Sequence, residues 1–275
     1  GGAAVRGGKS AAECVVDMLR ALPAYFAALL DTPEALSAHS LAIAAFSGTV
    51  GWVDQDHRPA QTVFAYKESG NWVAGTTIEA IEAQSVRLAD TERLQTYVDS
   101  WVAKVKRVYA PPSSEERETG QGTNIEAALY FAHRVAKTIS EAQHDHPSMR
   151  NITVQAFLAT DGEATAGQTM AGNIRDRLDE VLYADPGAAL GLKCCVPIQF
   201  HTLMMGNNTS VEMLTELMGS GGLLGYAKDP DAIASGLDAI LKPALTQGKG
   251  LLEMITFTEF VDDAGVRVSE MRMTV

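Results

Sequence analysis

Two apolar runs of the sequence end in short polar segments whose side chains can bind a ligand. Residues 152–159 run directly into Thr160-Asp161-Gly162-Glu163, and residues 196–204 end close to Gly206-Asn207-Asn208. In open α/β sheets, ligands bind outside the carboxyl ends of the strands. Asp161 therefore stands where a functional carboxylate is expected. The competing interpretation is that Asp161 is an ordinary turn residue before a glycine.

Two other segments have the composition of ligand sites. Gly120-Gln121-Gly122 precedes a predicted helix and resembles a phosphate cradle. It lacks the full glycine pattern and the lysine of nucleotide-binding loops, so we do not expect nucleotide binding. His144 and His146 flank Asp145 in a polar loop, where they are either metal ligands or, more commonly, solvated side chains.

No grouping of nucleophile, base and acid can be placed along the chain, and the protein is predicted not to be an enzyme. A metal-dependent phosphohydrolase built on Asp161 is the least favoured alternative. Thr123 and Glu126 also have the T-x-x-E spacing of a helix capping box, which gives the Thr123 hydroxyl a purely structural alternative role.

Composition excludes several partners. Among 275 residues, 34 are Asp or Glu and 22 are Lys or Arg, so the net charge is −12. Such a surface repels phosphate backbones and anionic membranes, and we expect no nucleic-acid partner and no membrane insertion. Cys14, Cys194 and Cys195 show no metal-ligand spacing, and they favour buried thiols in a reducing, cytoplasmic compartment.

The elements that must position these residues alternate between helix and strand. Helices are predicted at 9–30, 76–107, 123–139, 174–182, 209–218 and 229–241, and strands at 41–46, 61–66, 152–159, 196–204 and 223–226. This order predicts an α/β fold with a mostly parallel sheet and helices on both faces. Residues 251–261 and 266–275 flank a turn and predict a C-terminal β-hairpin. We therefore divide the chain into an α/β domain, 1–245, and a hairpin extension, 246–275.

Three ordered segments carry a family resemblance. They are Gly122-Thr123-Asn124-Ile125-Glu126, the apolar strand that ends in Thr160-Asp161-Gly162, and Gly206-Asn207-Asn208 with the helix that follows. In this order and spacing they resemble von Willebrand factor A domains over residues 9–245. The resemblance implies a Rossmann-like sheet and a metal-ion-dependent adhesion site at the strand ends.

In such a site, Mg²⁺ or Mn²⁺ is held by few protein oxygens, and an open position accepts a partner's carboxylate. By this resemblance, Thr123 is the hydroxyl ligand and Asp161 the carboxylate ligand. Asn124 and Glu163 are candidates for residues that do not contact the metal but orient its ligands or bound waters through hydrogen bonds.

The sequence departs from the family before Lys9. There the family has a strand and a DxSxS metal loop, whereas residues 1–8 contain neither Asp nor Ser. The strand lies upstream of residue 1, another segment replaces it, or the site is degenerate. With Thr123 and Asp161 alone, we expect weak metal binding.

These observations predict a non-catalytic protein-binding module, an adhesion or scaffold domain. Its partner protein docks on the loops at 47–60, 110–123, 161–172 and 206–209. The alternative is a structural subunit or fragment of a larger assembly, in which the C-terminal hairpin pairs with another chain and a free sheet edge requires a cover.

Overall fold

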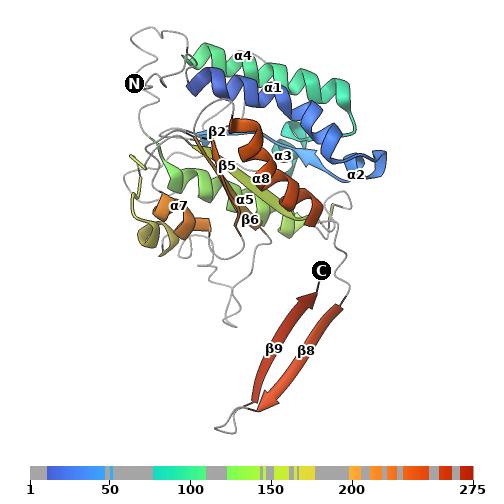
Figure 1. Ribbon diagram of the computed structural model, residues 1–275, viewed down its shortest axis with the longest axis vertical. Coiled ribbons are helices and arrows are strands. Elements are labelled where there is room, and N and C mark those ends of the chain that lie inside the picture. Colours follow the sequence, from blue (N-terminus) through green and yellow to red (C-terminus); the bar gives the residue numbers. More distant parts are fainter. Residues whose placement is uncertain are drawn as a thin grey trace.

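A computed structural model describes residues 11–46, 50–51, 77–109, 123–142, 145–146, 152–160, 164–165, 167–176, 198–205, 211–218, 222–227, 232–247, 254–261 and 267–274. In these residues a three-stranded parallel sheet lies among α-helices, and two strands near the C-terminus form a separate antiparallel pair (Figure 1). The predicted α/β fold with a parallel sheet is confirmed at this level.

The parallel sheet consists of β5 (Val154–Thr160), β6 (Ile198–Met205) and β7 (Leu224–Ala227), in that order. Phe157 of β5 is in register with His201 of β6, and Leu203 of β6 is in register with Gly225 of β7. These strands match three of the predicted apolar runs. All three therefore end on the same edge of the sheet, as the sequence interpretation required.

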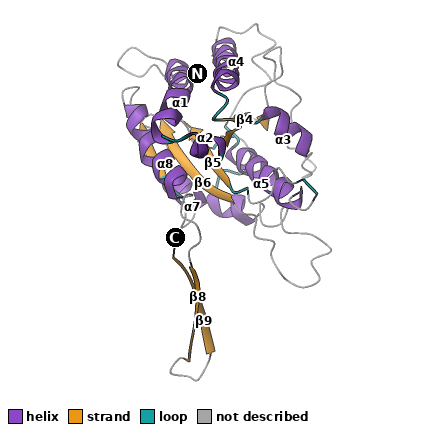
Figure 2. Cartoon of the chain, turned by 90° about the vertical axis from the view of Figure 1, so that its right-hand side faces the viewer, coloured by secondary structure: helices purple, strands orange, loops and turns teal. Residues whose placement is uncertain are grey.

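Helices cover both faces of this sheet. On one face, α8 (Ile233–Gln247) contacts β6 and β7, and α1 (Ala11–Leu29) contacts α8 and α4 (Thr91–Tyr109). On the other face, α7 (Val211–Met218) contacts β6, and α5 (Ile125–Ala142) contacts β5 (Figure 2). Side chains of a strand point alternately to its two faces. Accordingly, Leu203 packs with α1, α4 and α8, and Met204 packs with α5 and α7.

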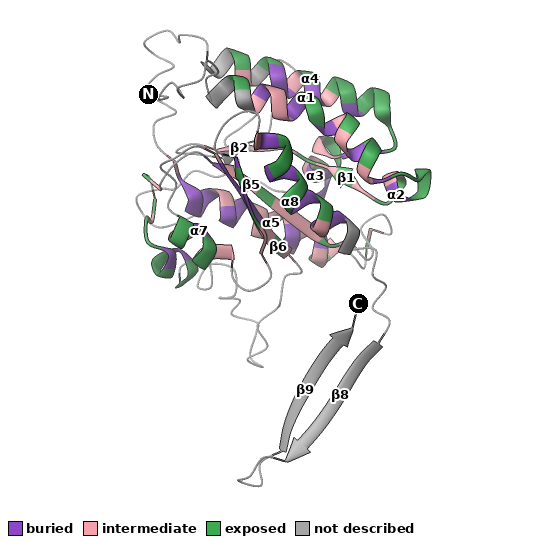
Figure 3. Cartoon of the chain, viewed as in Figure 1, coloured by how far each residue is buried: buried purple, intermediate pink, exposed green. Residues whose placement is uncertain are grey.

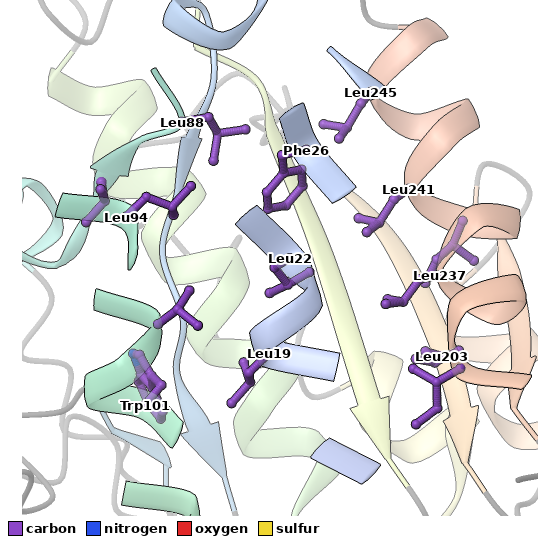
Figure 4. Packing of buried hydrophobic residues seen from close by; sticks show 14 of the residues in the cluster. Leu19, Leu22, Phe26, Leu88, Leu94, Trp101, Leu203, Leu237, Leu241 and Leu245 are labelled. Carbon is purple, nitrogen blue, oxygen red and sulfur yellow. The ribbon is translucent and has the colours of Figure 1, made fainter. Parts of the chain in front are cut away.

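The larger core lies between α1, α4, α8 and the sheet, where apolar side chains are buried (Figures 3 and 4). Its members on the helices recur at helical spacing, namely Leu19, Leu22, Phe26, Leu94, Trp101, Leu237, Leu241 and Leu245, and Leu203 joins them from β6. We refer to these three helices as the first helical layer, and to α5 and α7 as the second. Burial of these apolar stripes is the main force that holds the layers on the sheet.

Several helices begin at a polar residue that caps the first turn. In each, a side-chain oxygen accepts a hydrogen bond from the backbone N–H three residues later, which satisfies a donor that the helix itself leaves open. These pairs are Thr32 with Ala35 in α2 (Pro33–Ser37), Thr77 with Ala80 in α3 (Ile78–Gln84), Asp90 with Arg93 in α4, and Asn124 with Ala127 in α5.

Two glycines set the distance between α8 and β7. A Cβ atom added to Gly225 would lie 2.4 Å from the carbonyl oxygen of Gly236, and one added to Gly236 would lie 2.7 Å from a methyl carbon of Leu203. These separations are shorter than van der Waals contact. The helix and the strand therefore approach each other backbone to backbone.

The predicted strand at 41–46 is wrong as a member of the parallel sheet. It is two short strands: β1 (Ser40–Leu41) pairs antiparallel with β4 (Val86–Arg87), and β2 (Ala45–Phe46) pairs antiparallel with β3 (Val50–Gly51). Between them, the Ile43 N–H donates to the Tyr97 hydroxyl at 2.8 Å instead of to a neighbouring strand. An apolar run alone does not reveal such a side-chain contact.

The remaining predictions have mixed outcomes. The helix-prone stretch 76–107 contains two helices, α3 and α4, separated by β4, because Val86 is buried as a short strand. The C-terminal hairpin is confirmed as β8 (Met254–Val261) paired antiparallel with β9 (Arg267–Thr274). The predicted strand at 61–66 lies outside the described residues, as does the predicted helix at 174–182 beyond residue 176.

Candidate functional site

The start of α5 lies against the segment that follows β5. The Thr123 N–H donates to Thr165 Oγ1 at 2.8 Å, and the Thr165 N–H donates to the Thr123 carbonyl oxygen at 3.0 Å. β5 ends at the buried residue Thr160, a few residues before this contact. The two reciprocal bonds therefore fix the backbone beside the carboxyl end of β5.

Glu126 adds a third bond to this contact. Its side chain is 1% exposed, and its Oε2 accepts a hydrogen bond from the Gln168 N–H at 2.9 Å. Because buried polar side chains are stable where they are hydrogen-bonded, this bond ties the loop after β5 to the first turn of α5. We call residues 123–126 together with Thr165, Gly167 and Gln168 the strand-end clasp.

Asn124 caps α5 within the clasp. It is 2% exposed, and its Oδ1 accepts from the Ala127 N–H at 2.9 Å. The capping-box interpretation of Thr123 and Glu126 is wrong, because Asn124 is the capping residue. The Glu126 carboxylate reaches the N–H of Gln168 instead of that of Thr123, and the Thr123 N–H bonds to Thr165.

The clasp requires glycine at position 167. Its φ is +70°, a left-handed conformation that side chains other than glycine rarely adopt. A Cβ atom there would lie 2.5 Å from Asn124 Oδ1 and 2.9 Å from Glu126 Oε2. Gly167 thus lets the loop backbone reach both buried polar side chains.

The structure places the predicted site residues unequally. Thr123 is partly buried in the clasp and Asn124 is buried behind it, so both lie next to the segment after β5. Asp161 and Glu163 lie outside the described residues, although Asp161 directly follows Thr160 in the sequence. Sequence reasoning did not assign a site role to Glu126, Thr165 or Gln168.

The donor atoms of the clasp fit a cation only in part. Asn124 Oδ1 and Glu126 Oε2 already accept backbone hydrogen bonds, and among the described residues Thr123 is hydrogen-bonded through its backbone alone. Thr123 can therefore offer a hydroxyl, and a carboxylate must come from elsewhere, with Asp161 as the candidate. No group of three or more His, Cys, Asp or Glu side chains suited to a metal ion occurs within the described ranges, which include His146 but not His144.

Exposed apolar side chains follow the strands β5 and β6. Met170, just beyond the clasp, is 66% exposed, and Val211, at the start of α7, is 47% exposed. The Met170 carbonyl accepts from the Ile174 N–H at 3.0 Å, so its backbone belongs to the first turn of the helical segment 171–176. A fixed backbone that presents an exposed methionine is typical of a protein-binding surface.

A second polar network joins the strands toward their amino ends, away from the clasp. The Leu223 N–H donates to His201 Nδ1 at 3.1 Å, which leaves the proton on Nε2, 2.7 Å from Gln155 Oε1. Gln155 Nε2 in turn donates to Gln199 Oε1 at 3.1 Å. His201 is 1% exposed, and its burial lowers the pKa of the imidazole below the ordinary 6.5. This network orients strands, and its histidine is too buried to meet a ligand.

The sequence matches no protein-family profile, and a search among curated proteins finds no significant relative. Within the described residues, no helix is both long and apolar enough to cross a membrane.

Proposed function

We propose that this chain is a non-catalytic protein-binding module of the von Willebrand factor A type. Its partner docks at the carboxyl ends of the strands, on the strand-end clasp and the loops around it. The observation that supports this most is the clasp itself: three hydrogen bonds hold the backbone after β5 against α5. Preorganised loops lose little conformational entropy on binding, which favours a recognition surface.

The exposed Met170 is the expected apolar anchor of this surface. Apolar side chains at the centre of an interface usually contribute most of the binding energy. Glu126 contributes indirectly, because its carboxylate holds the backbone that leads to Met170. We therefore treat Glu126 as a positioning residue.

We extend the proposal to a divalent cation, Mg²⁺ or Mn²⁺, with Thr123 and Asp161 as its protein ligands. The cation supplies an open coordination position for a carboxylate of the partner. With one hydroxyl and one carboxylate from this chain, most positions remain with water, and we expect weak binding in the absence of the partner.

Calorimetric titration with Mn²⁺ tests the cation part. Thr123→Ala removes the hydroxyl but leaves both backbone bonds of the clasp in place, so we expect unchanged stability and lost Mn²⁺ heat. Thr96→Ala is the matched control, because that exposed hydroxyl only donates to the Glu92 carbonyl of its own helix. If the wild-type chain gives no heat, or Thr123→Ala gives the same heat, the cation part of the proposal is wrong. The proposed docking surface does not depend on that result.

Photo-crosslinking tests the docking surface. A photoreactive amino acid at the exposed Thr169 should yield a discrete protein adduct in extracts of the source cells, and one at Gln95 on α4 should not. We expect Met170→Asp and Glu126→Ala to abolish the adduct, and Glu126→Gln to retain it, because the glutamine oxygen still accepts from Gln168. Equal labelling from both positions would contradict the proposal.

A further inference from the structure

Met170 is the most exposed large apolar residue in the described part of the chain. It is 66% exposed, whereas Met204 is 3% exposed, and Met205 and Met213 are partly buried against the two apolar clusters. The space beside it is open, because a Cβ atom added to Gly172 would meet no atom within 4 Å. The thioether sulfur of Met170 is therefore accessible to a small reagent in the solvent.

The neighbouring residues keep Met170 in this exposed position. Its carbonyl oxygen accepts the hydrogen bond that opens the helical segment 171–176, from the Ile174 N–H at 3.0 Å. Ala171 is 5% exposed and Ile174 is 0% exposed, and Ile174 belongs to the apolar cluster of the second helical layer. The segment cannot rotate to bury Met170 without moving Ile174 out of that cluster. The exposure of Met170 is thus fixed by the fold.

Methionine is a poor residue for this position on grounds of stability alone. A residue whose carbonyl opens a helix is preferably Ser, Thr, Asp or Asn, because a side-chain oxygen then caps the first turn, as Asn124 does in α5. Methionine supplies no such oxygen, and at 66% exposure it gains little from burial. Departures from local sequence rules are expected at functional positions. The position therefore indicates a role for the Met170 side chain beyond folding.

We propose that Met170 is an oxidation site through which a peroxide regulates the strand-end surface. The sulfur attacks one oxygen of hydrogen peroxide, an S–O bond forms, the O–O bond breaks and water leaves. The sulfur thereby loses two electrons, and the peroxide is reduced. The product sulfoxide is polar, and methionine sulfoxide reductases return it to the thioether. The regulation rests on the proposed function, in which Met170 is the apolar anchor for the partner.

Peptide mapping by mass spectrometry tests the site without a partner. The purified chain is treated with hydrogen peroxide, circular dichroism verifies that it stays folded, and sulfoxide formation is followed at each methionine. Met170 should be oxidised about tenfold or more faster than Met204 and Met213, because burial shields their sulfurs. Equal rates at Met170 and Met213 would overturn the proposal, since they would show that the Met170 sulfur is covered in solution.

Photo-crosslinking from Thr169 tests the regulation. Catalase removes the peroxide from the treated chain before the cell extract is added, so that only this chain is oxidised. The adduct yield should fall about tenfold or more, because a polar group replaces the apolar anchor, and a methionine sulfoxide reductase should restore it. An unchanged yield from a chain whose Met170 is oxidised would overturn the proposal.

Substitutions assign the effect to Met170. Met170→Leu has no sulfur, so peroxide should not change its adduct yield, whatever that yield is before treatment. Met170→Gln carries a neutral polar side chain in place of the sulfoxide and should give little adduct with or without peroxide. Met213→Leu removes a partly buried methionine and should stay sensitive to peroxide as the wild-type chain does. Loss of the Met170→Leu adduct on treatment would overturn the proposal, and the reductase measurement decides the question if Met170→Leu gives no adduct.

The two readouts separate a failure of the regulation from a failure of the proposed function. If the untreated chain gives no adduct, the docking surface is wrong, whereas selective oxidation of Met170 still identifies a modification site. If Met170→Asp abolishes the adduct but oxidation of Met170 leaves it unchanged, the docking surface is supported and the regulation is wrong.

Discussion

The two helical layers of this protein are held in different ways. The first layer, α1, α4 and α8, meets the sheet through a continuous apolar cluster. The second layer also buries apolar residues, but α5 begins with the buried polar residues Asn124 and Glu126, which bond to backbone N–H groups. Hydrophobic burial is non-directional, whereas hydrogen bonds fix positions. The first layer therefore mainly supplies stability, and the start of the second mainly fixes the loop after β5.

The strongest test of this contrast removes apolar volume from the first layer. Leu203 of β6 is 2% exposed and belongs to the apolar cluster between the sheet and the first layer. Leu203→Ala should lower the free energy of unfolding by about 2–5 kcal/mol, because burial is lost and a cavity remains. Leu224→Ala, at a 37% exposed position of β7, should cost far less. Urea denaturation measures both.

Equal losses from the two leucine variants would show that the first layer is not a tightly packed core. In that event the contrast between the layers would disappear, because neither would depend on close apolar packing.

A smaller effect is expected from a glycine pair in the second region. Gly167→Ala imposes a side chain on a φ of +70° and on the buried oxygens of Asn124 and Glu126, and should cost about 1–3 kcal/mol. Gly172→Ala, in the helical segment 171–176 with no atom within 4 Å of the added Cβ, should stabilise by about 0.5–1 kcal/mol. Thermal denaturation measures the sign of the stability change for both variants. If Gly167→Ala left the stability unchanged, the clasp would not be tightly packed around position 167.

The smallest effect concerns pH and the polar network of the sheet. Burial holds the pKa of His201 below 6.5 in the folded chain. Just below pH 6.5, His201 is therefore protonated in the unfolded chain but still neutral in the folded chain. The His201 contribution to the free energy of unfolding is therefore complete above about pH 6.5. It decreases as the pH falls through the lowered pKa, where the new proton on Nδ1 would face the Leu223 N–H.

His201→Gln lacks this titration, so its free energy of unfolding should vary less with pH than that of the wild-type chain between about pH 5 and 6.5. Denaturant titrations at several pH values measure the difference in slope. Identical slopes would assign the acid sensitivity to other groups.

Apolar patterning predicted the first layer and the central strands well. Apolar runs in the local sequence predict the strand ends near Thr160 and Met205. The helical spacing of apolar residues predicts the helix after position 123. The parallel sheet also followed, because alternating helices and strands permit few other arrangements. By contrast, the segment 41–46 is apolar enough for an interior strand, but it pairs with β4 and β3, and its Ile43 N–H bonds to Tyr97 of a helix 54 residues away in sequence.

Polar contacts were harder to predict. Glu126 was expected to bond within its own first turn, because the T-x-x-E spacing is a local signal, but its partner Gln168 is 42 residues away. Gly167 carried no special pattern in the sequence, since its positive φ depends on the buried oxygens opposite it. The roles of Asp161 and Glu163 stay predictions, and so does the division into domains at 245.

The backbone approach of Gly225 to Gly236 has a consequence for recognising distant relatives. A Cβ atom at position 225 would meet the backbone of α8, so a homologue that keeps this helix–strand packing should keep glycine there, however far its other residues have diverged. At position 236 the obstacle is a methyl group of Leu203, so a small residue is tolerated if that side chain changes. A glycine in the short strand, followed by a small residue early in the next helix, would thus remain recognisable after overall sequence identity is lost.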